Sequence, residues 1–430
     1  MSPNASETMP VTGRYRLLGH PTDLEGHLTA LGPAPLPSGR QRGWREWFVS
    51  VLEASGLAGR GGAGFPAAIK LAVAHAAGPG GTVVVNGMEG EPASDKDKLL
   101  LIRAPHLVLD GAQLLAAASG ARSVTVAVPQ GREHVAAAVL AAMAERARTA
   151  HAPVPEEMVR PPDRFIAGEE SALAAWFETG RSLPSFRPDK GTALRIGRKG
   201  ALVQNAETLA HVAMIARTGP DLFRAHGLVE DPGTSLVTIS GSVEHPGVVE
   251  VDRGTPIIDV ANRATPLGPP QALLVGGYGG AWVGPEQFGT PYASLSLRAV
   301  GATAGVGIVI VLGRDVCGLM ETARVVHYLA GQSAGQCGPC VYGLPAIADD
   351  VTRLARGHAD HGLLARLERR LAQVEGRGAC RHPDGAVNVA RSALRVFADD
   401  VRRHAAGTVC EHWNRGTQLR FPTVLRAAAS

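Results

Sequence analysis

The stretch Gly81-Thr-Val-Val-Val-Asn-Gly-Met-Glu-Gly-Glu-Pro92 decides the fold class, because a short apolar run ends abruptly in a polar turn. Three consecutive valines are typical of a strand that is buried on both faces, as in parallel sheets. Glu89 and Glu91 follow at the carboxyl end of this strand, where α/β sheets place their ligands. The stretch therefore predicts an α/β domain with carboxylates near a ligand site.

Helical and strand patterns alternate on both sides of this strand. Helical spacing is found at 44–55 and from about Pro66 onward. After the strand, residues 104–121, 123–128 and 133–147 have the patterns of a helix, a strand and a helix. This alternation predicts a parallel sheet covered by helices.

The pattern changes twice further along the chain. Residues 234–240 and 247–251 flank a glycine turn and predict a small β domain, which one more apolar strand at 306–312 closes. Apolar residues at 363–374 and 394–401 then recur at helical spacing, and several helices in succession predict a bundle.

We therefore divide the 430 residues into four parts. Residues 1–45 are predicted to form an irregular arm, 46–225 a ligand-binding α/β domain, 226–313 a β domain with its closing strand, and 314–430 a helical domain.

Composition and charge exclude several classes. Five cysteines favour a reducing compartment over a disulfide scaffold. We find no apolar stretch of membrane-helix length and no secretory signal, and no basic run with interleaved aromatic residues that would indicate nucleic-acid binding. We expect a cytoplasmic protein without a membrane span of its own, either free or peripheral to a membrane complex.

The charge is uneven. From Arg314 to the end there are 16 arginines, no lysine and 11 acidic residues, whereas the remainder has 27 basic and 28 acidic residues. Two interpretations stay open: ordinary solvated helix faces, or a docking face for an acidic partner.

A glycine-rich loop, Gly59-Arg-Gly-Gly-Ala-Gly-Phe65, lies between two predicted helices. Missing side chains let a backbone approach a ligand closely, and N–H groups at a helix start favour phosphate. Arg60 and Lys70 add positive charge. A glycine-rich turn without a ligand is the alternative, and the loop does not match the dinucleotide fingerprint.

Two further polar segments are candidates. Glu169 and Glu170 lie at a predicted helix start, where they either contact a ligand or stabilise the helix dipole. Asn205 and Thr208 lie in Gln204-Asn-Ala-Glu-Thr208, where the asparagine is either a ligand or a helix cap.

Cys337 and Cys340 form a C-x-x-C motif, and Cys380 follows 40 positions later. The motif has three functional interpretations, which are a redox dithiol, half a zinc site or part of an iron–sulfur site. Buried thiols without a ligand are the alternative. The helical context disfavours a thioredoxin-like dithiol, and a second C-x-x-C for zinc is missing. Cys317 and Cys410 have no motif context and are predicted to be structural.

In their order and spacing, these segments resemble one family across about residues 45 to 400. It is the flavin- and NADH-binding subunit of bacterial respiratory complex I, the F-type subunit of NADH-quinone oxidoreductase, shared by NAD-linked hydrogenases and formate dehydrogenases. The similar stretches are 56–70, 83–98, 165–173, 203–210, 234–256 and 331–340 with Cys380.

The resemblance implies a Rossmann-like FMN domain, a ubiquitin-like β-grasp domain and a four-helix bundle with a [4Fe–4S] cluster. It implies that the flavin is surrounded by Gly59, Arg60, Gly61, Gly62, Lys70, Asn86, Glu89, Gly168, Glu169, Asn205 and Thr208. It places the nicotinamide nucleotide beside Phe65, Lys70, Glu91 and Glu170, and the cluster on Cys337, Cys340 and Cys380. The flavin itself carries the hydride chemistry, so no protein residue is expected to be catalytic.

The chain departs from the family at two sites. The first cysteine of the family's C-x-x-C-x-x-C motif is Ala334, which leaves a three-cysteine cluster with an open or substitute ligand, a [3Fe–4S] cluster, or none. Cys317 or Cys410 could stand in for the missing ligand, but nothing in their spacing supports this. A family carboxylate is Met88 here, and a family aromatic is Leu71, so the nucleotide pocket is less well preserved than the flavin pocket.

The resemblance implies an NADH dehydrogenase module, an FMN-dependent oxidoreductase subunit that takes a hydride from NAD(P)H. Its electrons would leave singly through the cluster to a ferredoxin-like or quinone-reducing partner. The alternatives are a non-catalytic structural subunit of a redox complex, and a flavoenzyme that receives electrons from a ferredoxin.

Overall fold

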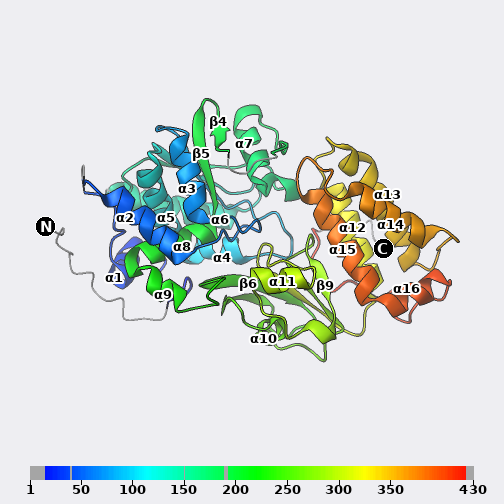
Figure 1. Ribbon diagram of the computed structural model, residues 1–430. Helices are drawn as coiled ribbons and strands as arrows, with labels where there is room; N and C mark the ends of the chain where they lie inside the picture. Colours follow the sequence, from blue (N-terminus) through cyan, green and yellow to red (C-terminus); the bar gives the residue numbers. More distant parts are fainter. Residues whose placement is uncertain (1–14, 39–40, 150, 188–191, 423–430) are drawn as a thin grey trace. The chain divides into compact units, whose positions relative to one another are not determined.

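The structure is a computed structural model that describes residues 15–38, 41–149, 151–187 and 192–422 (Figure 1). The chain folds into two compact units that are each discontinuous in sequence. The first unit lies within Met1–Gly87, Asp97–Pro161 and Gly191–Ser235, and the second within Met88–Lys96, Pro162–Lys190 and Leu236–Ser430.

The first unit contains a five-stranded sheet in the order β3-β2-β1-β5-β4. Its strands are β1 (Thr82–Asn86), β2 (Ser123–Ala127), β3 (Glu156–Val159), β4 (Leu194–Ile196) and β5 (Lys199–Asn205). All neighbours are parallel except β4 and β5. The chain adds β2 and β3 on one side of β1 and β5 on the other, so the strand order reverses between β1 and β5. Ligands of open α/β sheets bind at such a reversal.

Helices cover this sheet, and two of them pack closely on β1. The helices are α1 (Leu24–Leu31), α2 (Trp44–Ser55), α3 (Ala67–Ala76), α4 (Lys96–Arg103), α5 (Pro105–Ser119), α6 (Glu133–Arg148), α8 (Ala206–Thr218) and α9 (Pro220–Arg224). A Cβ atom on Gly111 of α5 would lie 2.0 Å from the carbonyl oxygen of Leu209 in α8. Only glycine therefore permits the observed approach of these two helices.

The irregular arm predicted for residues 1–45 is wrong for the segment that forms α1. The Asp23 side chain accepts a hydrogen bond from the Gly26 backbone N–H (2.8 Å) and caps the helix, which ends at Gly32. The helix is only eight residues long, too short for a clear apolar period. Residues 1–14 and 39–40 of this range lie outside the described residues.

The second unit contains a five-stranded sheet in the order β7-β6-β10-β8-β9. Its strands are β6 (Thr234–Gly241), β7 (Gly247–Asp252), β8 (Ala272–Val275), β9 (Ala281–Val283) and β10 (Ile308–Leu312). The first strand, β6, and the last, β10, are parallel neighbours in the middle of the sheet, and β8 is antiparallel to β10. This is the β-grasp arrangement that the family resemblance implies.

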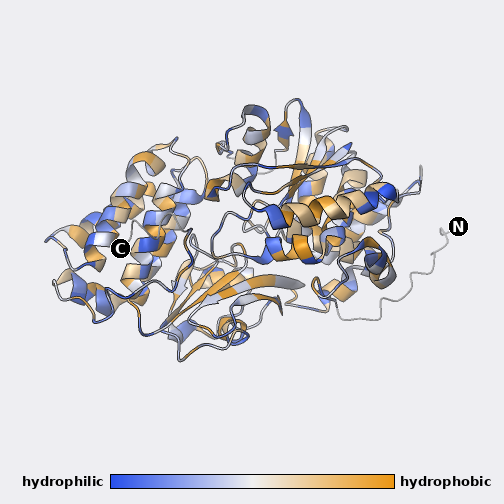
Figure 2. Cartoon of the chain, turned by 180° about the vertical axis from the view of Figure 1, so that it is seen from behind, coloured by the Kyte–Doolittle hydropathy of each residue, from blue (hydrophilic) through white to orange (hydrophobic). Residues whose placement is uncertain are grey.

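Both faces of this sheet are covered, which explains its continuous apolar strands (Figure 2). Ile308 and Ile310 of β10 pack into the core shared with the C-terminal helices. Val309 and Val311 point to the other face, where they share a core with Ile257 of a short helix. The short elements beside the sheet are α10 (Ile257–Asn262), the 3₁₀ helix η2 (Pro285–Gln287) and α11 (Ser294–Ala299).

The C-terminal part is helical, as predicted. Its helices are α12 (Gly318–Gly331), α13 (Leu344–Ala355), α14 (Leu363–Val374), α15 (His382–Val396) and α16 (Ala398–Ala405). The first four pack in a closed ring, α12 on α13 and α15, and α14 on α13 and α15. Leu363, Leu367, Leu371 and Val374 of α14 are buried, which confirms the helical apolar period.

No single helix among the described residues is long and apolar enough to cross a membrane; α4 and α5, bent by 95°, pass such a test only as a pair and only by length and composition.

Trp282 of β9 joins the second sheet to the helical bundle, and its substitution tests how much this contact stabilises the fold. Its ring is fully buried against Phe397, and its indole N–H donates to the Thr322 hydroxyl of α12 (2.9 Å). Trp282→Phe keeps the apolar contact but removes the donor, so we expect a loss of about 1–2 kcal/mol in the free energy of unfolding. Trp47→Phe, at a ring that is 42% exposed, is the control and should change it by less than about 0.5 kcal/mol in urea denaturation. Equal effects would contradict this account.

Candidate functional site

The glycine loop of the first unit is a tight turn between α2 and α3. The backbone N–H of Gly59 donates to the carbonyl of Phe65 (2.9 Å) and closes it. Gly62 (φ 100°) and Gly64 (φ 61°) lie in the left-handed region, which side chains disfavour. Residues 61–64 are exposed, and the loop leads directly into α3. A solvent-facing glycine turn at a helix start is suited to an anionic ligand.

The loop contacts the point where the strand order reverses. The Arg60 backbone N–H donates to the hydroxyl of Thr208 on α8 (2.9 Å). A Cβ atom on Gly61 would lie 3.2 Å from the Cβ of Asn205, at the end of β5. Asn205 is in turn the register partner of Asn86, the last residue of β1. The structure therefore brings together five predicted site residues that are up to about 150 positions apart in sequence.

Arg60 does not project into the solvent. Its guanidinium donates to the carbonyl of Pro232 (3.1 Å), lies 4.0 Å from the Asp231 carboxylate and is largely buried. The side chain anchors the loop, so the backbone and the half-buried Lys70 on α3 remain as the groups that suit a phosphate.

Asn205 is a helix cap, as one of the two sequence interpretations predicted. Its side-chain oxygen accepts from the backbone N–H of Glu207 (3.0 Å), and its amide donates to the Asp97 carboxylate (2.7 Å). Both bonds fix the amide at the carboxyl edge of the sheet. Its contact with a flavin stays a prediction.

The turn after β1 belongs to the second unit from Met88 onward. Met88 is buried, and a Cβ on Gly168 would lie 3.1 Å from its carbonyl oxygen. Glu89 accepts a hydrogen bond from the Ser94 hydroxyl, and Glu91 accepts from the Tyr278 backbone N–H (3.0 Å). Hence residues 88–92 of the first predicted carboxylate segment lie beside the second predicted segment, which begins at Phe165.

Glu169 caps the helix that follows it. The 3₁₀ helix η1 (Phe165–Gly168) leads into α7 (Glu170–Thr179), and the Glu169 carboxylate accepts from the backbone N–H groups of Ser171 and Ala172, both at 2.9 Å. Glu170 lies 3.6 Å from the Arg187 guanidinium. The helix-start interpretation is therefore confirmed, whereas their cofactor contacts stay predictions.

The three motif cysteines converge at one end of the bundle. Cys340 is buried in a π-helical turn (η3, Pro339–Gly343) that continues into α13, and Cys380 precedes α15. Burial acts to raise the pKa of Cys337, but N–H groups of Ala379 and Cys340 and the Cys340 thiol outweigh it, and this pKa lies below its ordinary value. The N–H contact from Ala379 places the Cys380 segment against Cys337.

The predicted flavin segment of the second unit packs on this cysteine region. The Phe165 ring lies 5.4 Å from the His382 ring and 6.1 Å from the Tyr328 ring. Burial raises the pKa of Cys380, and the nearby Glu169 carboxylate adds to the rise. A residue expected to contact the flavin thus lies within electrostatic range of a residue expected to hold the cluster.

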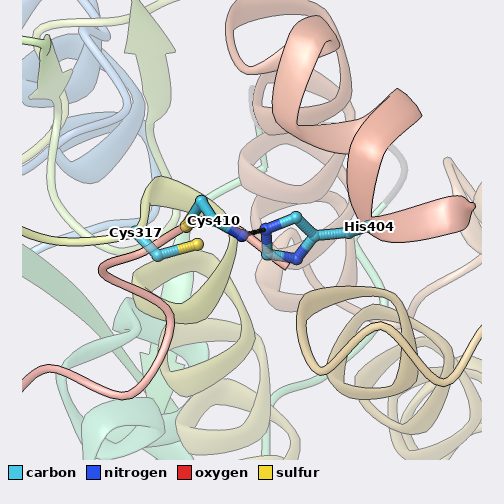
Figure 3. A group of neighbouring side chains, drawn as sticks. All are labelled: Cys317, His404 and Cys410. Carbon is cyan, nitrogen blue, oxygen red and sulfur yellow. Dashed lines mark hydrogen bonds between the residues drawn. The ribbon is translucent and has the colours of Figure 1, made fainter. Parts of the chain in front are cut away.

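Cys317 and Cys410 do not supply the missing fourth thiolate. Cys317 precedes α12 and Cys337 follows its end, and 14 helical residues at 1.5 Å each separate them by about 21 Å. Cys410 lies beside Cys317 (Figure 3). The possibility that either could substitute for Ala334, which their sequence spacing did not support, is therefore excluded, because the length of α12 holds both away from the cluster cysteines.

Lys96 is a buried charged residue that the sequence pattern does not reveal. Its side chain is almost fully buried, and a Cβ on Gly307 would lie 3.0 Å from its Cδ atom. A buried lysine requires specific partners. Its position at the start of α4 gave no signal, because a lysine at a helix end is normally a solvated residue.

Two family models match the chain. Residues 52–214 match the Nuo51 FMN-binding domain, and residues 320–404 match the NADH-ubiquinone oxidoreductase-F iron–sulfur binding region. Together they cover more than half of the sequence.

Two F-type subunits are similar to most of the chain. One F-type subunit of the NADH-quinone oxidoreductase of Rhizobium meliloti is 28% identical over 377 residues, 84% of this chain and 90% of that protein. The corresponding F-type subunit of Streptomyces coelicolor is 27% identical over 84% of both chains.

Two solved structures of an NAD⁺-reducing [NiFe]-hydrogenase are also similar. The air-oxidized state has a TM-score of 0.77 at 28% identity and covers 97% of this chain and 71% of that chain. The H₂-reduced state has a TM-score of 0.75 at 30% identity over 86% of this chain, which spans 63% of that chain's length.

Fold, site and comparisons together define a class of redox protein that has an FMN-binding domain and an iron–sulfur binding region. The chain belongs to the family of F-type subunits of NADH-quinone oxidoreductase, as a divergent member that has Ala334 in place of the first cluster cysteine.

Proposed function

We propose that this protein is the electron-input subunit of a redox complex, which oxidises NAD(P)H and delivers single electrons to a partner. The observation that carries the proposal lies within the second unit, where the segment 165–170 packs directly on the cysteine region. FMN accepts a hydride as an electron pair, and an iron–sulfur cluster takes one electron at a time.

The residues of the first unit fit an FMN phosphate. The exposed residues 61–64 of the glycine loop present their backbone just before α3, and Lys70 follows in the first turn of that helix. Asn86 and Asn205 would hold polar groups of the flavin at the end of β1 and β5. In the second unit, the proposed flavin contacts are Glu89, Gly168 and Glu169. Hydrogen bonds already orient the carboxylates of the two glutamates.

The cysteines fit a cluster with three protein thiolates. Cys337, Cys340 and Cys380 converge, and N–H donors lower the pKa of Cys337 and so favour its thiolate. A [4Fe–4S] cluster would have an open or non-cysteine fourth position here, and a [3Fe–4S] cluster would be complete.

The nicotinamide nucleotide is proposed to bind beside Phe65, Lys70, Glu91 and Glu170. Phe65 is half-buried and offers a stacking surface next to the glycine loop. Where family members have a carboxylate, this chain has the buried apolar side chain of Met88.

We propose a cytoplasmic location, peripheral to a larger complex, with another redox subunit or a ferredoxin-like protein as acceptor. The arginine excess after Arg314 is weak support for docking, because many of these side chains already pair locally. Such pairs are formed by Arg324, Arg353, Arg366, Arg370, Arg381, Arg391, Arg402, Arg403 and Arg420.

Removal of FMN tests the order of electron flow. In full-length protein that keeps its iron, NADH should reduce the cluster only when FMN is bound, and added FMN should restore the reduction. Low-temperature EPR of the cluster under anaerobic conditions measures this. Cluster reduction by NADH in the FMN-free protein would contradict the proposed order.

A structural subunit without catalysis is the second candidate, favoured by Ala334 and Met88. It predicts a protein that contains neither iron nor reducible flavin after anaerobic purification. Iron and flavin contents of one preparation distinguish the two functions.

A further inference from the structure

A second group of metal-ligating side chains lies away from the cluster cysteines. The sulfur atoms of Cys317 and Cys410 and a ring nitrogen of His404 all lie within 4.8 Å of one another (Figure 3). Cys317 precedes α12, His404 belongs to α16, and Cys410 is in the loop that follows α16. All three are buried, and the His404 side chain is completely so.

The His404 ring has the tautomer that a metal ligand bound through Nε2 would have. Its Nδ1 lies 2.9 Å from the Ala355 carbonyl oxygen, which can only accept, so Nδ1 carries the proton. Nε2 then carries the lone pair, which accepts a hydrogen bond from the Cys410 backbone N–H (2.9 Å). Histidine ligands typically donate their other ring N–H to a carbonyl in this way.

The spacing suits one small ion. Zinc–sulfur bonds of about 2.3 Å and zinc–nitrogen bonds of about 2.0 Å in tetrahedral geometry separate ligand atoms by roughly 3.5–3.8 Å. The observed group lies within that scale, because all three atoms fit inside 4.8 Å. Two sulfurs with one imidazole are the donor set of zinc rather than of magnesium or calcium.

We propose that Cys317, His404 and Cys410 bind a single zinc ion that ties the start of α12 to α16 and the C-terminal loop. Two thiol protons leave as the ion enters, so Zn²⁺ with two thiolates is neutral, which a buried site requires. His404 Nε2 exchanges its bond with the Cys410 N–H for the ion. Water or a further side chain completes the coordination. The site is structural and lies about one α12 length from the cluster cysteines.

Metal analysis of the full-length protein, with Cys410→Ser and Cys337→Ser as a matched pair, tests the site. We expect about one zinc per chain in the unaltered protein and in Cys337→Ser, and at least about tenfold less in Cys410→Ser. Iron should follow the opposite pattern, lost in Cys337→Ser and kept in Cys410→Ser. Retained iron also shows that Cys410→Ser is folded.

Cobalt gives a spectroscopic readout of the same site, taken first on the unaltered protein. Co²⁺ added to iron-loaded, zinc-stripped protein should produce a sulfur-to-cobalt charge-transfer band, absent from Cys317→Ser. The proposal is overturned if unaltered protein takes up neither zinc nor cobalt, or if Cys410→Ser retains full zinc. It is also overturned if peptide mapping by mass spectrometry finds a disulfide between Cys317 and Cys410.

Discussion

Cys340→Ser is expected to remove most of the iron from the protein and to leave FMN bound. Cys340 is one of only three converging cysteines and is the most deeply buried of them, and its loss leaves two thiolates for a cluster that normally requires four. Iron and flavin per chain, determined on anaerobically purified protein, measure the effect.

Cys317→Ser is the control, because Cys317 lies at the opposite end of α12 and should not affect iron content. The reciprocal change, Ala334→Cys, supplies the family's missing thiolate and should slow the loss of iron to a chelator. Full iron content in Cys340→Ser would contradict the assignment of the cluster ligands.

Gly61→Val is expected to weaken FMN binding by about tenfold to a hundredfold without loss of iron. A Cβ at this position would already lie 3.2 Å from the Cβ of Asn205, and the two added methyl groups must displace the loop or the amide. Overpacking of this kind typically costs about 1–3 kcal/mol, and the flavin is lost when the loop moves away from β5.

Fluorescence titration of FMN into flavin-free protein measures this affinity. Gly268→Val is the matched control, since a Cβ there meets no atom within 4 Å and its backbone is not left-handed. If both variants bind FMN like the unaltered protein, the glycine loop is not part of the flavin site.

Local sequence patterns were sufficient for most of the fold. The valine run of β1, the helical spacing of α2 and the leucines of α14 each reflect burial within one element, and the structure confirms them. Strand order could not be predicted, because pairing such as Asn86 with Asn205 depends on contacts far apart in sequence. Helix α1 was missed because a single cap, Asp23, determines its start.

The candidate site also has features that the sequence shows and features that only the structure shows. Glycines of the loop and the C-x-x-C motif are visible in sequence because their spacing carries the chemistry. The sequence does not show where the Arg60 side chain points, nor that Cys317 lies beside Cys410. Both features result from tertiary packing. A helix-start role for Glu169 was one of two interpretations, and the contacts of α7 confirm it, whereas the cofactor contact stays a prediction.

Anaerobic titration of the FMN- and iron-loaded protein with NADH tests the central claim most directly. We predict stoichiometric bleaching of the flavin absorption band, which would show that the nucleotide site functions despite Met88 and Leu71. A flavin that dithionite bleaches but neither NADH nor NADPH does would contradict it, and would indicate a protein donor or a structural role.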